Sequence, residues 1–412
     1  MQASPLQTTS AAQVRRILVL IAVGLGALTV LGLIVLWPRG SAPNLRPPGA
    51  SVEYVDATVL TVNRSTCGSA ESEAPQDCQS VTARVSSGRN KGDTASFQIP
   101  TSQFNAPTLK VGDKVVLIDN PTAAAEFRYS FSDFQRNTPL VVLFLLFAGV
   151  VIAFGRWQGV RALAGLVASL AVVLIFLLPS LLRGNAALPV ALVASFLVAF
   201  LALYLAHGVN ANTTVALLGT MASLVVIAAL AALFVDLARL TGLSDEAAQL
   251  LRVTAEGVDP RGLIIAGTVV GALGVLDDVT VTQVSAVGEL RRADPTLSRV
   301  ALYRSAVRIG RDHVASTVNT LVLAYVGASL PLTLLFLEGG APWGRVAAQE
   351  VVAVEIIRTL VGSIGLVLSV PFTTALAALA MADPNPEAED DVGGEPPLPA
   401  DWADFAPEPK PW

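Results

Sequence analysis

Two adjacent acidic residues, Asp277 and Asp278, lie inside an apolar stretch at residues 262–288. The stretch is long enough for a membrane-spanning helix, which needs roughly 20 mostly apolar residues. A charged side chain at the bilayer centre costs about 2.5 to 3.5 kcal/mol on insertion scales, so such a residue usually marks a site or an interhelical contact. Asp278 is the leading candidate for a proton or cation site, and a hydrogen bond across a helix interface is the competing interpretation.

The spacing of small and polar residues separates the two carboxylates. One helical face carries residues that recur every three or four positions: Gly267, Gly271, Gly274, Asp278, Thr282, Ser285 and Glu289. Asp277 points about 100° away from this face, because a helix has about 3.6 residues per turn. Glycines at this spacing predict close approach of a neighbouring helix, which would hold Asp278 within a bundle. Two nearby carboxylates do not both ionise readily in a low dielectric, so we expect one to be protonated or to share a cation.

Two later apolar stretches carry similar polar faces. The first face contains Asp312, Ser316 and Asn319, and the second contains Glu355, Arg358, Gly362 and Gly365. Pro371 predicts a kink in the second helix. Three such faces on consecutive helices favour one shared polar pathway. Helix packing alone would also produce them, and Glu355 and Arg358 are spaced to form a simple ion pair across one turn.

These residues depend on membrane-spanning helices to position them. The chain of 412 residues is 53% hydrophobic and 14% charged, with a mean hydropathy of +0.61, which is too apolar for a soluble domain. We predict an all-α polytopic membrane helix bundle of about eight transmembrane helices. The apolar runs are residues 17–37, 139–154, 162–182, 187–206, 213–235, 262–288, 314–337 and 359–382.

Arginine distribution predicts the orientation, because Arg and Lys in short loops are retained in the cytoplasm. Six arginines fall in residues 291–311, between the sixth and seventh runs. This places the N-terminus in the cytoplasm, and an even number of helices returns the C-terminus there. Residues 1–37 are then a cytoplasmic stub with a signal-anchor helix, and residues 138–382 form a seven-helix membrane domain.

The same orientation exports residues 38–137, where the pattern changes to that of strands. Alternating or β-branched segments at residues 51–62, 80–85, 95–99 and 114–118 predict a small extracytoplasmic β-rich domain, either a barrel or a sandwich. Cys67 and Cys78 are the two cysteines of the chain, and an oxidising compartment favours a disulfide between them. The bridge would stabilise the domain by about 3 kcal/mol; two free thiols are the alternative.

Two segments outside the predicted membrane-spanning helices differ from them in composition. Residues 236–260 predict a short interfacial helix capped by Ser244. Residues 383–412 carry eight prolines and nine acidic residues against one lysine, which predicts a disordered cytoplasmic tail. Its aromatic residues, Trp402, Phe405 and Trp412, could instead form a docking motif for a protein partner.

Three ordered segments resemble the YibE/F-like family of bacterial multi-pass membrane proteins. They are GALGVLDDVTVTQVSAVGEL, GRDHVASTVNTLVLAYVGASLP and RTLVGSIGLVLSVPFTT, and the likeness extends from the second to the eighth apolar run. The resemblance implies a polytopic protein of the bacterial plasma membrane. Asp278 matches the family motif, whereas Asp277 stands where the family has a hydrophobic residue.

Two functions are consistent with these patterns. The first is a secondary permease for a proton, a cation or a small molecule, with Asp278 at its centre; the second is a non-transporting scaffold whose exported β domain binds a protein partner. No motif of a hydrolase, a zinc protease or a Walker ATPase is present. We therefore expect no enzyme activity, no cofactor, no metal site and no nucleic-acid partner.

Overall fold

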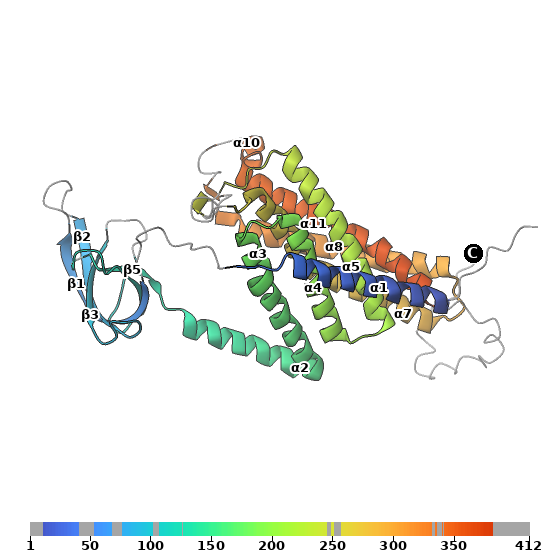
Figure 1. Cartoon of the computed structure of the whole chain (residues 1–412), viewed down its shortest axis with the longest axis horizontal. Helices are drawn as coiled ribbons and strands as arrows, with labels where there is room; N and C mark the ends of the chain where they lie inside the picture. Colours follow the sequence, from blue (N-terminus) through green and yellow to red (C-terminus); the bar gives the residue numbers. More distant parts are fainter. Residues whose placement is uncertain are drawn as a thin grey trace, which may run out of the picture. The chain divides into compact units, whose positions relative to one another are not determined.

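The fold is that of a computed structural model of the chain, in which the helices and strands form two compact units (Figure 1). One unit comprises residues 1–43 and 160–412, and the other comprises residues 44–159. Each unit is described by itself. The structure describes residues 11–40, 53–67, 76–101, 107–125, 127–244, 249–250, 257–331, 334–335, 340 and 342–381.

Long helices account for most of the described chain and occur at every predicted apolar run. Their bounds are Ala11–Val35 (α1), Asn137–Val172 (α2), Leu178–Leu182 (α3), Ala187–His207 (α4), Ala211–Leu237 (α5), Pro260–Ala293 (α7), Arg299–Ala328 (α8), Trp343–Ala347 (α10) and Glu350–Ala380 (α11). A π-helical turn at Val173–Leu177 (η1) joins α2 to α3. The prediction of a mostly helical chain is therefore confirmed.

Within the described residues, six helical segments are long and apolar enough to cross a membrane. They are Gln13–Val35, Asn137–Leu182, Ala187–His207, Ala211–Leu237, Pro260–Ala293 and Glu350–Ala380. The count differs from eight for two reasons. The second and third predicted runs join into one helical segment, and α8 carries four arginines along its first half.

Two helix boundaries differ from the sequence-based expectation. Arg156 interrupts α2 with φ 51° and ψ −128°, in the left-handed region, so the predicted connection between two runs is a sharp break. The expected arginine-rich loop at residues 291–311 is almost entirely helical, because α7 extends to Ala293 and α8 begins at Arg299. Leu302 and Ala306 bury one face of α8, whereas Arg304, Arg308 and Arg311 are exposed on the other, which makes this segment an amphipathic helix.

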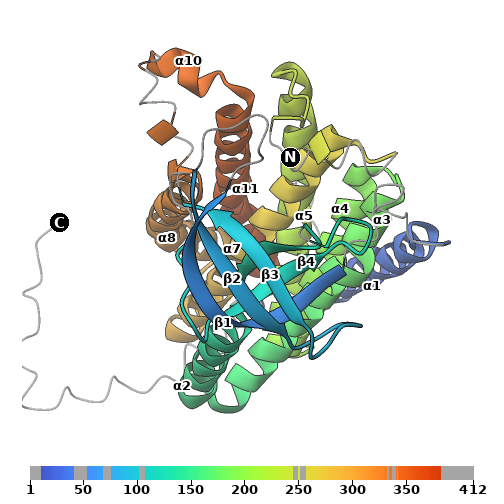
Figure 2. The same ribbon diagram turned by 90° about the vertical axis from the view of Figure 1, so that its left-hand side faces the viewer.

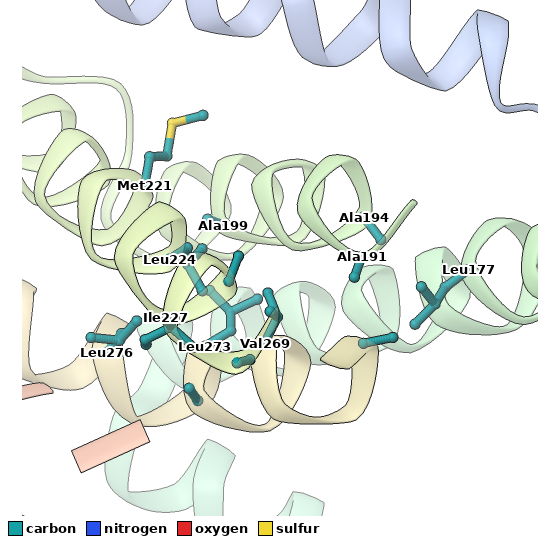
Figure 3. Close-up of a cluster of buried hydrophobic side chains, with 14 of the residues drawn as sticks. Leu177, Ala191, Ala194, Ala199, Met221, Leu224, Ile227, Val269, Leu273 and Leu276 are labelled. Carbon is teal, nitrogen blue, oxygen red and sulfur yellow. The ribbon is translucent and has the colours of Figure 1, made fainter. Parts of the chain in front are cut away.

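The helical unit buries apolar side chains in successive layers. The middle layer joins α4, α5, α7 and α11 and includes Leu224, Ile227, Val269, Leu273 and Leu276, which Figure 3 shows converging between these helices. A second layer, at one end of the bundle, contains residues from the start of α1 and from the end of α11. There Arg15 Nε donates to the carbonyl of Ala380 at 2.8 Å.

Glycine allows close contact between α5 and α11. A Cβ at Gly365 would overlap Ile227, and one at Gly219 would overlap Thr373. Gly362 has ordinary contacts, with Leu321 at 3.6 Å and Ala272 at 3.9 Å from the position of its Cβ. The predicted small-residue face of α11 therefore packs against α5, α7 and α8.

One buried amide connects three helices of the bundle. Gln283 of α7 donates through Nε2 to the carbonyl of Ala306 in α8 and to the hydroxyl of Thr374 in α11, each at 2.8 Å. Its side chain is 3% exposed. A buried amide with both contacts made fixes the relative position of the helices that it joins.

The second unit contains a curved antiparallel sheet, seen face-on in Figure 2. The strands are Glu53–Cys67 (β1), Gln76–Val85 (β2), Thr94–Pro100 (β3), Lys114–Asp119 (β4) and Tyr129–Phe134 (β5). The strand order is β3-β2-β1-β4-β5, and contacts between β3 and β5 curl the sheet into a half-barrel. The small β-rich domain is confirmed, with one strand more than predicted. The missed strand is β5, in which the alternation of Tyr129 and Phe131 with exposed serines is short and breaks off at Asp133.

Three predictions concern residues that the structure describes only in part. Cys67 lies opposite Gln76 in the β1–β2 ladder, two residues from Cys78, but the side chain of Cys67 is outside the described residues. The disulfide stays a prediction. Most of the expected interfacial helix within residues 236–260 and the acidic tail at residues 383–412 are also outside the described part of the chain.

A buried carboxylate stabilises the β4–β5 edge of the half-barrel. Asp119 is 2% exposed and accepts hydrogen bonds from Arg128 Nε at 2.8 Å and from Asn90 Nδ2 at 2.7 Å. The guanidinium of Arg128 holds the pKa of this carboxyl below its ordinary value, Asn90 contributes in the same direction, and burial opposes both. The ionised form is thus the one that the folded domain prefers.

We expect Asp119→Asn to weaken the domain in a pH-dependent way. The folded pKa is lowered, so the contribution of Asp119 is complete above the unfolded pKa of about 3.9 and is lost as the pH falls through the folded value. At neutral pH, hydrogen exchange of β1 and β4 in the full chain should be about tenfold faster in the variant. The difference should vanish at the lowest pH values.

Glu53→Gln is the matched control for this measurement. Glu53 pairs with Arg89 at 3.9 Å, and the side chains are 44% and 91% exposed, so its loss should change exchange little. A difference between Asp119→Asn and wild type that is the same at acid and neutral pH would contradict the assignment.

Candidate functional site

The predicted polar face of α7 lies open over most of its length. Gly271, Gly274 and Asp278 are all exposed, as are Ser285 and Glu289 further along the helix. Among the described residues, nothing lies within 4 Å of a Cβ at position 274. A Cβ at Gly271 would meet only the hydroxyl of Tyr325 at 2.9 Å, and one at Gly267 only the guanidinium of Arg358, at 3.4 Å. The predicted close approach of a helix backbone to these glycines is therefore wrong, because side-chain ends and open space occupy this face.

Both carboxylates line one pocket of about 660 Å³. We call it the aspartate pocket. Its walls are the second half of α2, the length of α4 and the middle of α7. The residues that define these walls include Gly165, Leu166, Ser169, Leu170, Ser195, Val198, Ala202, His207, Val270, Gly274, Asp277 and Asp278.

Asp277 lies at the boundary between this pocket and the packed core. Its neighbours along α7, Leu273 and Leu276, are buried in the middle layer. Its Oδ1 is buried without a hydrogen-bond partner in the structure, whereas Asp278 is exposed. Asp277 is thus the more enclosed of the two. An enclosed carboxylate oxygen without a donor is costly and is relieved by a proton or a cation.

Buried hydroxyl groups lie directly behind Asp277. Thr280 Oγ1 donates to the carbonyl of Asp277 at 3.2 Å and lies 2.8 Å from Thr220 Oγ1 of α5. Both threonines are fully buried. On the pocket side, the hydroxyl of Ser195 is buried and has no partner in the structure. The backbone around Asp277 is therefore held by α5, and the hydroxyl of Thr220 also lies beside the Asp277 carboxyl.

A smaller polar pocket of about 170 Å³ continues from the aspartate pocket. We call it the turn pocket, because it lies at the turn between α4 and α5. The two pockets share His207 and Val281. Asn210 and Ser285 are among its polar lining residues. The turn belongs to the end of the bundle where α1 begins and α11 ends, since Val215 and Ala216 of α5 pack in the same layer as Leu18 of α1.

The remaining predicted site residues are not at these pockets. Asp312, Ser316 and Asn319 lie exposed on α8. Glu355 and Arg358 form an ion pair at 2.7 Å with side chains 27% and 24% exposed, as their spacing allowed. Glu289 pairs with Arg292 at 2.7 Å on the surface. The single pathway expected along α7, α8 and α11 is replaced by pockets between α2, α4, α5 and α7.

Sequence reasoning missed part of this site. His207 lines both pockets but was not among the predicted site residues. Ser169 and Ser195 are small polar residues inside apolar runs, and that position was the signal that could have identified them. Among the described residues, no cluster of three metal-binding side chains is present.

These features define a polytopic helical membrane protein with a carboxylate-lined pocket inside its bundle. A family profile described as YibE/F-like protein matches residues 143–383, which is more than half of the chain. The chain belongs to the YibE/F-like family, as the three sequence segments indicated. Comparisons with curated proteins and with solved structures gave no match.

The pocket can be tested by cysteine labelling in a background with Cys67→Ser and Cys78→Ser. Ala202 lines the pocket, whereas Ala199, on the same helix, is 0% exposed. We expect Ala202→Cys to react with a small membrane-permeant maleimide at least about tenfold faster than Ala199→Cys, since buried thiols are unreactive. Equal rates at the two positions would show that the pocket is closed.

Proposed function

We propose that this protein is a secondary permease whose proton or cation site is the aspartate pocket. One observation carries the proposal: Asp277 and Asp278 line the same pocket between three helices. Intramembrane carboxylates that face a bundle interior commonly mark ion pathways. The proposal assigns no catalytic group to the chain.

The turn pocket supports the proposal by extending the route toward one end of the bundle. It adds His207, Asn210 and Ser285 as polar groups beyond the two aspartates. Toward the other end, Tyr325 and the Arg358 guanidinium lie over the glycines of α7.

A scaffold is the second candidate, and the polar face of α8 favours it. Ser316 and Asn319 are exposed, and polar side chains at membrane depth need a protein partner. In this function the α8 face and the β half-barrel would contact other proteins. The two candidates differ in whether ions cross the membrane.

Flux through proteoliposomes separates the two functions. With an imposed pH or sodium gradient, the wild-type chain should carry flux above that of empty liposomes. We expect Asp277→Asn and Asp278→Asn each to reduce flux to the empty-liposome level, because each removes a carboxylate from the pocket. Flux is measured with a pH-sensitive or sodium-sensitive dye.

Glu289→Gln is the matched control, because Glu289 is on the same helix but pairs with Arg292 outside both pockets. It should retain wild-type flux at equal insertion. Absence of wild-type flux under both gradients would favour the scaffold. Flux that survives both aspartate substitutions would reject the aspartate pocket as the site.

We further propose that the protein lies in the bacterial plasma membrane with both termini in the cytoplasm and the β half-barrel outside. Support comes from the hydrogen bond between Arg15 and Ala380, which brings the start of α1 and the end of α11 to the same end of the bundle. The Cys67–Cys78 disulfide belongs to this proposal. In the β1–β2 ladder the two residues are diagonal neighbours on one face.

One labelling experiment tests the orientation and the disulfide together. In right-side-out membrane vesicles, a membrane-impermeant polyethylene glycol maleimide should shift the chain on a gel only after treatment with a membrane-impermeant reductant. A shift without reductant would indicate free thiols. A shift that requires permeabilised vesicles would place the half-barrel on the cytoplasmic side.

A further inference from the structure

The charge of the aspartate pocket identifies the sign of its ligand. Asp277 and Asp278 contribute two carboxylates, and none of the described lining residues is Lys or Arg. His207 is the one described lining residue with a basic side chain. Arg161 is next to the lining residue Ala162, and its Nε donates to the carbonyl of Leu205 at 2.8 Å. The guanidinium is thus directed to the end of α4. A ligand that reaches the two carboxylates is favoured if it is positive.

The aliphatic walls of the aspartate pocket, between the carboxylates and His207, indicate that the ligand also has an apolar part. Most lining side chains are aliphatic, and Leu166, Leu170 and Val198 are examples from two helices. A bare alkali or divalent cation needs about six oxygen ligands to replace its water. Besides the two aspartates, the described lining offers side-chain oxygens only from Ser169 and Ser195. The pocket therefore suits an ion that brings its own apolar body.

The kind of charged head group that the ligand carries can be deduced from the lack of Phe, Tyr and Trp in the described lining of the aspartate pocket. Quaternary ammonium ions are typically recognised by cages of aromatic side chains, and no Phe, Tyr or Trp lines the aspartate pocket. A primary or secondary ammonium group instead donates N–H hydrogen bonds to carboxylates. Asp278 is exposed and lines the pocket, so its carboxylate oxygens can accept such a bond.

We infer that the aspartate pocket binds an amphipathic primary or secondary ammonium ion. Its head would contact Asp277 and Asp278, and its apolar body would lie along α2 and α4. A volume of about 660 Å³ is in the range of sites for drug-sized molecules. The inference rests on the proposed function, because it names the cargo of the same site.

Protection of Ala202→Cys from maleimide provides the test in nanodiscs, with the background Cys67→Ser and Cys78→Ser. The probes are phenylbutylamine, the neutral alcohol phenylbutanol, and the trimethylated quaternary analogue of the amine. We expect the amine to protect at a concentration at least about tenfold lower than either analogue, because a hydrogen bond between charged groups is worth that much. Asp277→Asn or Asp278→Asn should abolish this preference, whereas Glu289→Gln should preserve it.

The unliganded labelling rate of each variant reports whether its pocket is intact, so a misfolded variant is recognised and replaced by Asp→Glu at the same position. Comparing the ratio of protecting concentrations in each variant with that in wild type cancels the different partitioning of the probes into lipid.

Equal protection by amine and alcohol, or a preference that survives both aspartate substitutions, overturns the inference. Amine protection without proton or sodium flux would uphold the ligand class and reject gradient coupling. Flux without amine protection would uphold the permease and reject the ligand class.

Discussion

The bundle depends on one constraint, which is that the bilayer interior offers no water to polar groups. Several buried hydroxyls meet it within their own helix by donating to the carbonyl one turn earlier, as do Thr29, Thr268, Ser223, Thr359 and Thr374. Longer polar side chains cannot do this. Gln283 solves the problem by joining three helices, whereas Asp277 keeps a buried oxygen without a donor. Gln283 therefore fixes the relative position of three helices, whereas Asp277 retains a buried carboxylate oxygen without a hydrogen bond.

Helix α7 divides the helical unit into a closed side and an open side. On the closed side, α5 and α11 meet at Gly219 and Gly365, where any larger residue would collide with Thr373 or Ile227. On the open side, α2 and α4 leave the aspartate pocket. Asp277 lies between the closed and the open side, whereas Asp278 is exposed on the open side. This division explains why two adjacent residues of the same type have different environments.

Hydropathy was sufficient to predict where the helices occur, because long apolar runs have few other structures available in lipid. It failed where charge obscured an amphipathic helix, as in the arginine-bearing first half of α8, and where strand alternation was weak, as in β5. Helical spacing placed Asp278 on the same face of α7 as Gly271 and Gly274 but could not identify what that face contacts. That information depends on which helices pack together, and α8 with Asn319 packs away from the pocket whereas α4 with His207 lines it. The walls of the site are tertiary features that no single helix pattern contains.

The contact between Arg15 and Ala380 joins residues that are 365 positions apart. During synthesis the ribosome produces α1 well before α11, so α1 must remain in the membrane without this neighbour until α11 has been made. Domains usually acquire structure in order from the N-terminus, but this contact cannot follow that order. The layer that contains Leu18 and Ala377 closes only when the last helix has inserted. A chain truncated before α11 would leave Arg15 without the carbonyl of Ala380 and Gln283 without the hydroxyl of Thr374, and polar groups without partners are what the bilayer interior tolerates least.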